Sequence, residues 1–324
     1  MHPHFLYPAT LLIGAFLSNA APLETRADKR PVFSIAHKIL TVGALEDALY
    51  DRSSALEVDL TAWRKGDKGE GDDPADTSRW WMDHNGDGKS FGDPADVLLK
   101  AIGDKASTDD NDISFVMFDI KTPNYCEPDE EGCGMGTLVD MARDLVTSKG
   151  IRVVYGITTP DDASGSGFEY ITQNLDDDTA VRITGQTDDV LKAYEDYGGD
   201  IPEGKRIIDY GNAYLDARNG APEFGKCESA DGDEVCPNLV KAVQARDDGK
   251  IGKVLGWTVG HSDYDGDRTN DMLDAGLDGI VYGYGMEEYE DSKKTVSAME
   301  HITSWIGDHS DIAYPAAGDD APWA

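Results

Sequence analysis

Six ionisable side chains interrupt short, otherwise apolar segments in the first 121 residues of the chain. They are His37, Glu57, Asp59, His84, Asp119 and Lys121. Glu57 and Asp59 are two residues apart, which places both side chains on the same face of a β-strand. Two carboxylates at such close range repel each other unless a cation or a proton lies between them. The pattern therefore indicates a cation site next to titratable groups.

The residue types in this set suit the cleavage of a phosphodiester. Glu57, Asp59 and Asp119 offer hard oxygen ligands, which Mg²⁺ and Ca²⁺ prefer. A bound cation together with Lys121 can neutralise a phosphate group and the charge that develops at phosphorus during reaction. The two histidines allow one imidazole to accept a proton while the other donates a proton to the leaving oxygen.

Nine apolar runs alternate with helix-like segments and supply the elements that must position these side chains. The runs are Val32–Ile39, Ala55–Leu60, Trp80–His84, Ile113–Lys121, Ile151–Ile157, Ala180–Thr184, Arg206–Tyr210, Lys253–Val259 and Gly279–Tyr282. Such alternation indicates βαβ units and a largely parallel sheet. We predict a single-domain (β/α)₈ TIM barrel, so one run must be an excursion from the eight barrel strands. A doubly wound sheet is the alternative, although no glycine-rich phosphate loop opens the first unit.

The position of the six side chains in these runs agrees with a barrel active site. Active sites of TIM barrels form at the C-terminal ends of the strands. The six residues lie in or at the ends of four successive runs, so the prediction is that they meet at one rim.

The chain is strongly acidic, with 63 Asp and Glu against 29 Lys and Arg and a formal net charge of −34. A surface of this charge repels nucleic acids and anionic membranes, so no nucleic-acid partner is expected. High net charge also favours solubility outside the cell. A lipid substrate would carry a zwitterionic or neutral head group.

The N-terminus predicts a secreted protein. Phe5 to Leu17 is an apolar stretch too short to span a bilayer, and Ser18-Asn19-Ala20 offers a small-residue cleavage site. Lys29-Arg30 is a dibasic site of the kind that a kexin-type protease cuts. We therefore expect a signal peptide over residues 1–20, a propeptide over 21–30 and the barrel over 31–324. No later apolar run approaches the length of a transmembrane helix.

Four cysteines are present, an even number that favours two disulfides in a secreted chain. Three pairings are possible, and the short spacings favour Cys126–Cys133 and Cys227–Cys236 as local loop closures. Zinc binding is the alternative, but neither pair has a histidine nearby or the two-residue spacing of a zinc site.

Three further motifs extend the pattern: Trp257-Thr258-Val259, the segment Asp274 to Ile280, and the tail Asp319 to Trp323. Together with the two histidines, the Glu-x-Asp at 57–59 and the Asp-x-Lys at 119–121, this ordered set resembles the sphingomyelinase D/phospholipase D family of spiders and fungi. More distantly it is similar to the glycerophosphodiester phosphodiesterases. The resemblance spans about Phe33 to Trp323.

The resemblance implies a role for each of these residues. His37 and His84 would be the catalytic pair, and Glu57, Asp59 and Asp119 would hold one Mg²⁺. Lys121 would contact phosphate, and Trp257 would form a wall for the choline cation, a contact that contributes ~0.5–2 kcal/mol. The tail would plug the lower end of the barrel.

The resemblance also implies a substrate and a reaction. A monomeric enzyme would cleave choline from sphingomyelin or lysophosphatidylcholine at a membrane surface or in micelles. The substrate's own hydroxyl would attack phosphorus and leave a cyclic phosphate.

The sequence departs from the family pattern near the end of the barrel. Gly260 follows Trp-Thr-Val where the family usually has an acidic residue, and Tyr282 to Gly285 lacks a side chain that would help to orient a histidine. Asp87, three residues after His84, is a candidate for that orienting role.

Two alternative functions stay open. One is a soluble glycerophosphodiester phosphodiesterase, which is favoured if the tail does not plug the barrel. The other is a non-catalytic, secreted calcium-binding barrel with a weak Ca²⁺ site at Asp263, Asp265 and Asp267.

Overall fold

The computed structural model describes residues 29–67, 77–86, 91–106, 113–216 and 221–323. Eight parallel strands form the barrel, and successive barrel strands pair with one another, with a register shift between β9 and β10. β1 pairs with both β2 and β10, so the sheet closes on itself and confirms the predicted (β/α)₈ barrel. The barrel strands are β1 (Arg30–Ala36), β2 (Ala55–Trp63), β5 (Phe115–Ile120), β6 (Arg152–Ile157), β7 (Thr179–Thr184), β8 (Arg206–Gly211), β9 (Lys253–Val259) and β10 (Gly279–Tyr282).

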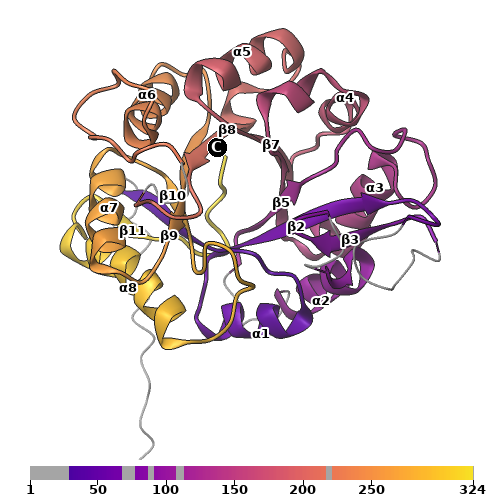
Figure 1. The fold of residues 1–324 in the computed structure, drawn as a ribbon, viewed down its shortest axis with the longest axis horizontal. Helices are drawn as coiled ribbons and strands as arrows, with labels where there is room; N and C mark the ends of the chain where they lie inside the picture. Colours follow the sequence, from indigo (N-terminus) through magenta and orange to yellow (C-terminus); the bar gives the residue numbers. More distant parts are fainter. Residues whose placement is uncertain (1–28, 68–76, 87–90, 107–112, 217–220, 324) are drawn as a thin grey trace, which may run out of the picture.

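Helices surround the barrel as an outer ring (Figure 1). Within the described residues they are α1 (Val42–Tyr50), α2 (Ala95–Ala106), α3 (Met135–Leu145), α4 (Ser166–Gln173), α5 (Thr187–Tyr197), α6 (Val235–Asp247), α7 (Asp263–Asp274) and α8 (Lys293–Asp308). Side-chain hydroxyls start several of them by accepting hydrogen bonds from free backbone N–H groups, as Thr41, Ser262 and Ser292 do. Short 3₁₀ turns lie at Thr147–Lys149, Pro160–Ser164 and Glu203–Lys205.

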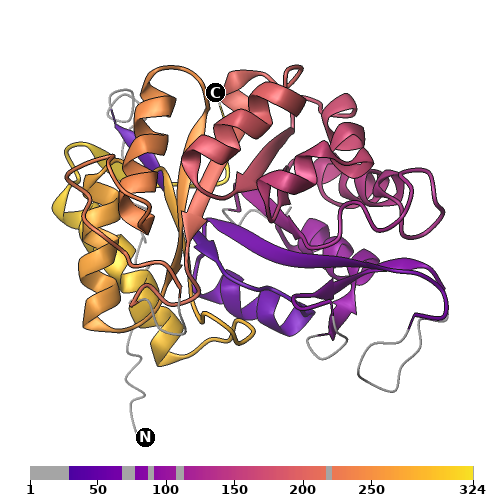
Figure 2. The ribbon, with the colours of Figure 1, turned by 45° about the horizontal axis from the view of Figure 1, so that its top comes forward.

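The run Trp80–His84 is the excursion, which corrects the prediction that His84 ends a barrel strand. β2 is nine residues long and continues past the rim, and β3 (Arg79–Asp83) returns along it as an antiparallel partner. β4 (Phe91–Pro94) then pairs antiparallel with β3. The hairpin of β2 and β3 projects beyond the ring of helices (Figure 2). Because β3 runs back toward the barrel, His84 still arrives at the rim.

The lower end of the barrel is closed by the C-terminal tail. The yellow tail crosses the middle of the ring in Figure 1. Trp323 is 7% exposed and packs against inward-facing residues near the starts of the strands, among them Phe33 and Phe115. Its indole N–H donates a hydrogen bond to the carbonyl of Asp177 at 3.1 Å. The expected plug is thus present, and β11 (Ala313–Pro315) leads into it by pairing with the start of β1.

Both predicted disulfides are present, with Cα–Cα distances of 5.9 Å for Cys126–Cys133 and 5.1 Å for Cys227–Cys236. No helix in the described part of the chain is long and apolar enough to cross a membrane.

Most of the predicted leader lies outside the described residues. Of its last residues, Arg30 begins β1, and its guanidinium donates to the carbonyls of Leu273 and Leu277. The predicted cleavage point therefore lies within a strand of the folded chain.

Candidate active site

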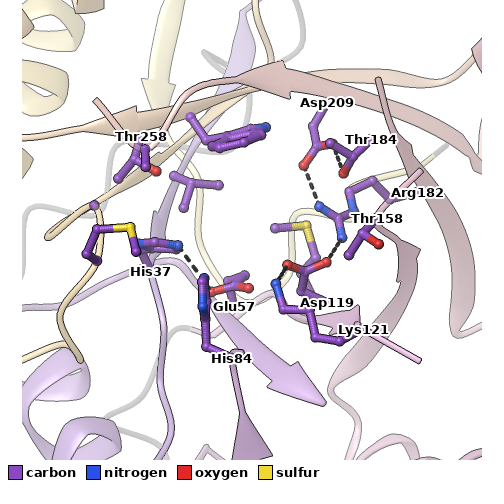
Figure 3. Close-up of a pocket in the computed structure, with 16 residues that line it drawn as sticks. His37, Glu57, His84, Asp119, Lys121, Thr158, Arg182, Thr184, Asp209 and Thr258 are labelled. Carbon is purple, nitrogen blue, oxygen red and sulfur yellow. Dashed lines mark hydrogen bonds and ion pairs between the residues drawn. The ribbon is translucent and has the colours of Figure 1, made fainter. Parts of the chain in front are cut away.

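A cavity of about 260 Å³ opens at the C-terminal ends of the barrel strands. The structure brings six of the predicted site residues to its wall: His37, Glu57, His84, Asp119, Lys121 and Trp257. Figure 3 shows His37 and His84 on one side of this cavity, with Arg182 and Asp209 on the opposite side. Another predicted site residue, Asp59, lies fully buried beside the cavity. Residues that are far apart in sequence thus form one site.

The three predicted metal ligands form a compact cluster. One oxygen of each of Glu57, Asp59 and Asp119 lies within 4.8 Å of the others. The strand register produces this cluster, because Asp59 on β2 is directly opposite Asp119 on β5. Burial raises the pKa of Glu57 well above its usual value, and the negative charges of Asp59 and Asp119 raise it further. A cation within the cluster would relieve this repulsion.

Lys121 lies between two of these carboxylates. Its Nζ atom is 2.8 Å from Asp59 Oδ1 and also contacts Asp119 Oδ2. Burial favours the neutral form of Asp119, but the charges of Lys121 and Arg182 outweigh it and hold the pKa of this carboxyl below its usual range. Lys121 was expected to contact phosphate, and in this structure its contacts are with the carboxylate cluster.

The cluster fits a divalent cation on its donor chemistry. Asp59 Oδ2 is buried and has no hydrogen-bond partner, as suits a metal-ligand oxygen. Among the described residues at this rim, the carboxylates of Glu57, Asp59, Asp119 and Asp209 outnumber the cationic side chains of Lys121 and Arg182 by two. A doubly charged ion balances this excess, and hard carboxylate oxygens suit Mg²⁺.

The two histidines are held differently. Nδ1 of His37 lies 2.6 Å from the backbone carbonyl of Tyr284, which only accepts hydrogen bonds, so Nδ1 carries the proton. Nε2 is therefore unprotonated and lies 4.0 Å from Glu57 Oε2. Burial lowers the pKa of His37 to about 4, although the charge of Asp59 opposes the shift. His37 is thus neutral at pH 7, with a lone pair at the cavity.

His84 is more exposed and has a side-chain partner. Its Nδ1 lies 2.7 Å from Oδ1 of the adjacent Asn85. Asp87, the predicted orienting residue, lies outside the described residues. His37 is oriented by a backbone group, the carbonyl of Tyr284.

Sequence reasoning missed the opposite wall of the cavity. Arg182 on β7 donates from Nη2 to Asp119 Oδ1 at 2.6 Å and from Nη1 to Asp209 Oδ2 at 2.6 Å. Thr184 donates to the other oxygen of Asp209, also at 2.6 Å. A charged residue inside each of two buried runs was the available signal, the same signal that identified Glu57.

Trp257, predicted to contact the choline cation, is half-buried at the cavity wall. Its indole N–H and the hydroxyl of the following Thr258 are both buried and have no hydrogen-bond partner. The structure thus places the aromatic ring of Trp257 at the wall of the cavity.

The expected calcium loop is a helix, which corrects that prediction. Asp263 to Asp267 form the first turns of α7, and the carboxylate of Asp265 accepts hydrogen bonds from the backbone and hydroxyl of Ser262. Successive helical residues are rotated by about 100°, so Asp265 faces away from the other two aspartates. The three carboxylates therefore do not converge on one ion.

Comparison with known proteins agrees with the site. A family model described as Sphingomyelinase D/Phospholipase D matches residues 27–323. A sphingomyelinase D of Aspergillus flavus is 36% identical over 295 residues, covering 91% of each chain. A sphingomyelinase D of Ajellomyces capsulatus is 31% identical over 334 residues, covering 97% of this chain and 96% of the relative.

Among solved structures, a glycerophosphoryl diester phosphodiesterase from Parabacteroides distasonis overlays with a TM-score of 0.48 at 11% identity. The overlay covers 86% of this chain and 88% of that chain.

Proposed function

Because the chain belongs to the sphingomyelinase D/phospholipase D family, we propose that it releases choline from sphingomyelin or lysophosphatidylcholine in a Mg²⁺-dependent reaction. One observation carries the proposal. A single cavity holds a neutral, half-buried histidine and a more exposed histidine beside three clustered carboxylates. This combination supplies proton transfer and charge neutralisation, which phosphodiester cleavage requires.

His37 is the proton acceptor in this proposal. Its Nε2 lone pair takes the proton of the attacking hydroxyl as the oxygen–phosphorus bond forms. His84 gives a proton to the choline oxygen as its bond to phosphorus breaks, so the proton count balances. Attack by the substrate's own hydroxyl leaves a cyclic phosphate, whereas attack by water leaves a phosphomonoester.

Glu57, Asp59 and Asp119 are the residues that would hold Mg²⁺. When bound, the ion supplies positive charge to the phosphate and to the charge that builds up on its oxygens. Lys121 and Arg182 add two fixed positive charges at the same rim. Lys121 and Arg182, together with the ion, thus offset the negative charge of the diester in a cavity that is otherwise acidic.

Trp257 is the proposed contact for the choline cation. Its ring lies at the cavity wall, and an aromatic face attracts a quaternary ammonium group by ~0.5–2 kcal/mol. The closed lower end of the barrel agrees better with this function than with a glycerophosphodiester phosphodiesterase.

Phosphorus NMR of the products tests the function directly. We expect choline and a cyclic phosphate from sphingomyelin and lysophosphatidylcholine, with slow turnover of glycerophosphocholine. Preferred cleavage of glycerophosphocholine would establish the glycerophosphodiesterase alternative. No turnover of any of the three with added Mg²⁺ would refute the proposal.

We also propose that the enzyme is an extracellular monomer released by signal-peptide cleavage. The two disulfides support an oxidising compartment. Mass spectrometry of the secreted chain's N-terminus tests both proposed cleavage points, after residue 20 and after residue 30.

A further inference from the structure

Arg182 is among the most buried charged groups of the molecule, with 4% of its surface exposed. Its guanidinium bridges Asp119 on β5 and Asp209 on β8, on two strands that are not neighbours. An arginine is costly to bury unless its donors are paired, and both terminal nitrogens are paired here. The bridge fixes one oxygen of Asp119 and leaves the other, Oδ2, on the side of Asp59.

Gly156 on β6 makes this bridge possible. The strand register places Asp119, Gly156 and Arg182 side by side on β5, β6 and β7. A Cβ atom on Gly156 would lie 2.3 Å from Nη2 and 2.4 Å from Nε of Arg182, far inside contact distance. The guanidinium therefore crosses β6 through the space that the missing side chain leaves.

We propose that Arg182 is a positioning residue for the cation site: by crossing Gly156 it holds the Asp119 carboxylate in the orientation that a divalent cation needs. The inference rests on the proposed function in assigning the cation to Glu57, Asp59 and Asp119. Outer-shell partners of this kind orient metal ligands, and their loss typically weakens metal binding by roughly 10–100-fold.

Loss of the charge of Arg182 and loss of its positioning role predict opposite effects on cation affinity, which makes the proposal testable. If electrostatics alone acted, removal of the positive charge of Arg182 would tighten the binding of a cation to the neighbouring carboxylates. Losing the orientation of Asp119 would weaken it. Arg182→Gln, Arg182→Lys and Gly156→Ala separate the two effects, because the last two variants keep the positive charge.

Binding of Mn²⁺, followed by the electron paramagnetic resonance signal of the free ion, is the measurement, and it needs no turnover. We expect each of the three variants to bind Mn²⁺ roughly 10–100-fold more weakly than the wild type. The double variant of Arg182→Lys and Gly156→Ala should be little worse than either single one, because both changes disrupt one contact. Arg246→Gln is the matched control, since it breaks the Arg246–Asp278 pair outside the cavity and should leave Mn²⁺ affinity unchanged.

The outcomes distinguish this inference from the proposed function. A wild-type protein that binds no Mn²⁺ would overturn both. Unchanged affinity in folded Arg182→Lys and Gly156→Ala, or tighter binding in Arg182→Gln, would overturn the positioning role alone. Should Gly156→Ala fail to fold, as circular dichroism would show, Arg182→Lys carries the test.

Discussion

Replacing His37 by asparagine tests the assignment of the proton acceptor. The side-chain amide of asparagine can still donate to the Tyr284 carbonyl, as Nδ1 of His37 does, but it offers no lone pair in place of Nε2. General acid–base catalysis typically contributes ~10²–10⁴-fold, so kcat should fall by about that factor. His84→Asn should cost a similar factor. The double variant should be little worse than either single variant, because the two histidines act as one unit.

The pH dependence of the rate gives a second test of His37, because it shows the pH at which the proton acceptor is lost. With a pKa of about 4, His37 is neutral over most of the acid range, whereas an ordinary histidine begins to gain its proton near pH 6.5. The proton acceptor is thus available down to about pH 4, and activity should fall through the protonation of His37 only near that pH. The carboxylate cluster also takes up protons in acid, but the pH at which it does so should drop as Mg²⁺ is raised. The loss of activity in acid that stays at the same pH in saturating Mg²⁺ should be the one due to protonation of His37.

The assay is choline release between pH 3.5 and 9 at several Mg²⁺ concentrations up to saturation, a range that extends below the acid limit expected near pH 4. His261, His301 and His309 lie outside the cavity wall, so their alanine variants serve as controls and should keep wild-type kcat. A wild-type rate in His37→Asn would refute the reasoning. An acid limit that stays near pH 6.5 at every Mg²⁺ concentration would refute the assignment of His37 as the buried base.

Three other predictions follow from the same geometry. Trp323→Ala should lower the free energy of unfolding in urea by about 3–5 kcal/mol, because a buried indole is lost. It should leave kcat unchanged, since Trp323 lies at the end of the barrel opposite to the active-site cavity. Trp257→Ala should raise KM for sphingomyelin about 2- to 30-fold while Trp257→Phe recovers part of the loss; equal KM values in all three proteins would exclude a contact with choline. Asp59→Asn keeps the shape of a buried ligand and removes its charge, so activity should need at least about tenfold more Mg²⁺. Chelation should stop wild-type turnover without changing the circular dichroism spectrum. Activity that survives chelation would contradict the metal site.

The barrel and the core of its site could be predicted because they depend on local patterns. Alternation of apolar and acidic residues in Ala55–Leu60 sets which face of β2 looks inward. In the structure Leu56, Val58 and Leu60 belong to one hydrophobic cluster and Ala55, on the other face, to a second one. Parallel strands bring their C-terminal ends to one rim, so side chains such as Asp119 could be placed without knowing the register. Short loops made the disulfide pairing predictable for the same local reason.

The parts that escaped prediction depend on contacts between distant segments. The direction of the Trp80–His84 run is set by pairing with β2, and an apolar run alone does not reveal whether its partner is parallel or antiparallel. The role of Arg182 depends on its contacts with Gly156 and Asp119, which lie beside it in the sheet but are distant from it in the sequence. The Tyr284 carbonyl is a backbone group, which leaves no trace in residue type.

The contact between His37 and Tyr284 also has a consequence for synthesis of the enzyme. The two residues are 247 positions apart, and they meet only when β10 docks against β1 and completes the ring. A ribosome makes β1 well before β10, so a growing chain contains His37 long before that residue has its carbonyl partner. Contacts between such distant segments form late because the long loop must close first. The nascent enzyme should therefore stay inactive toward the lipids of the cell that makes it until β10 has been made and has docked against β1.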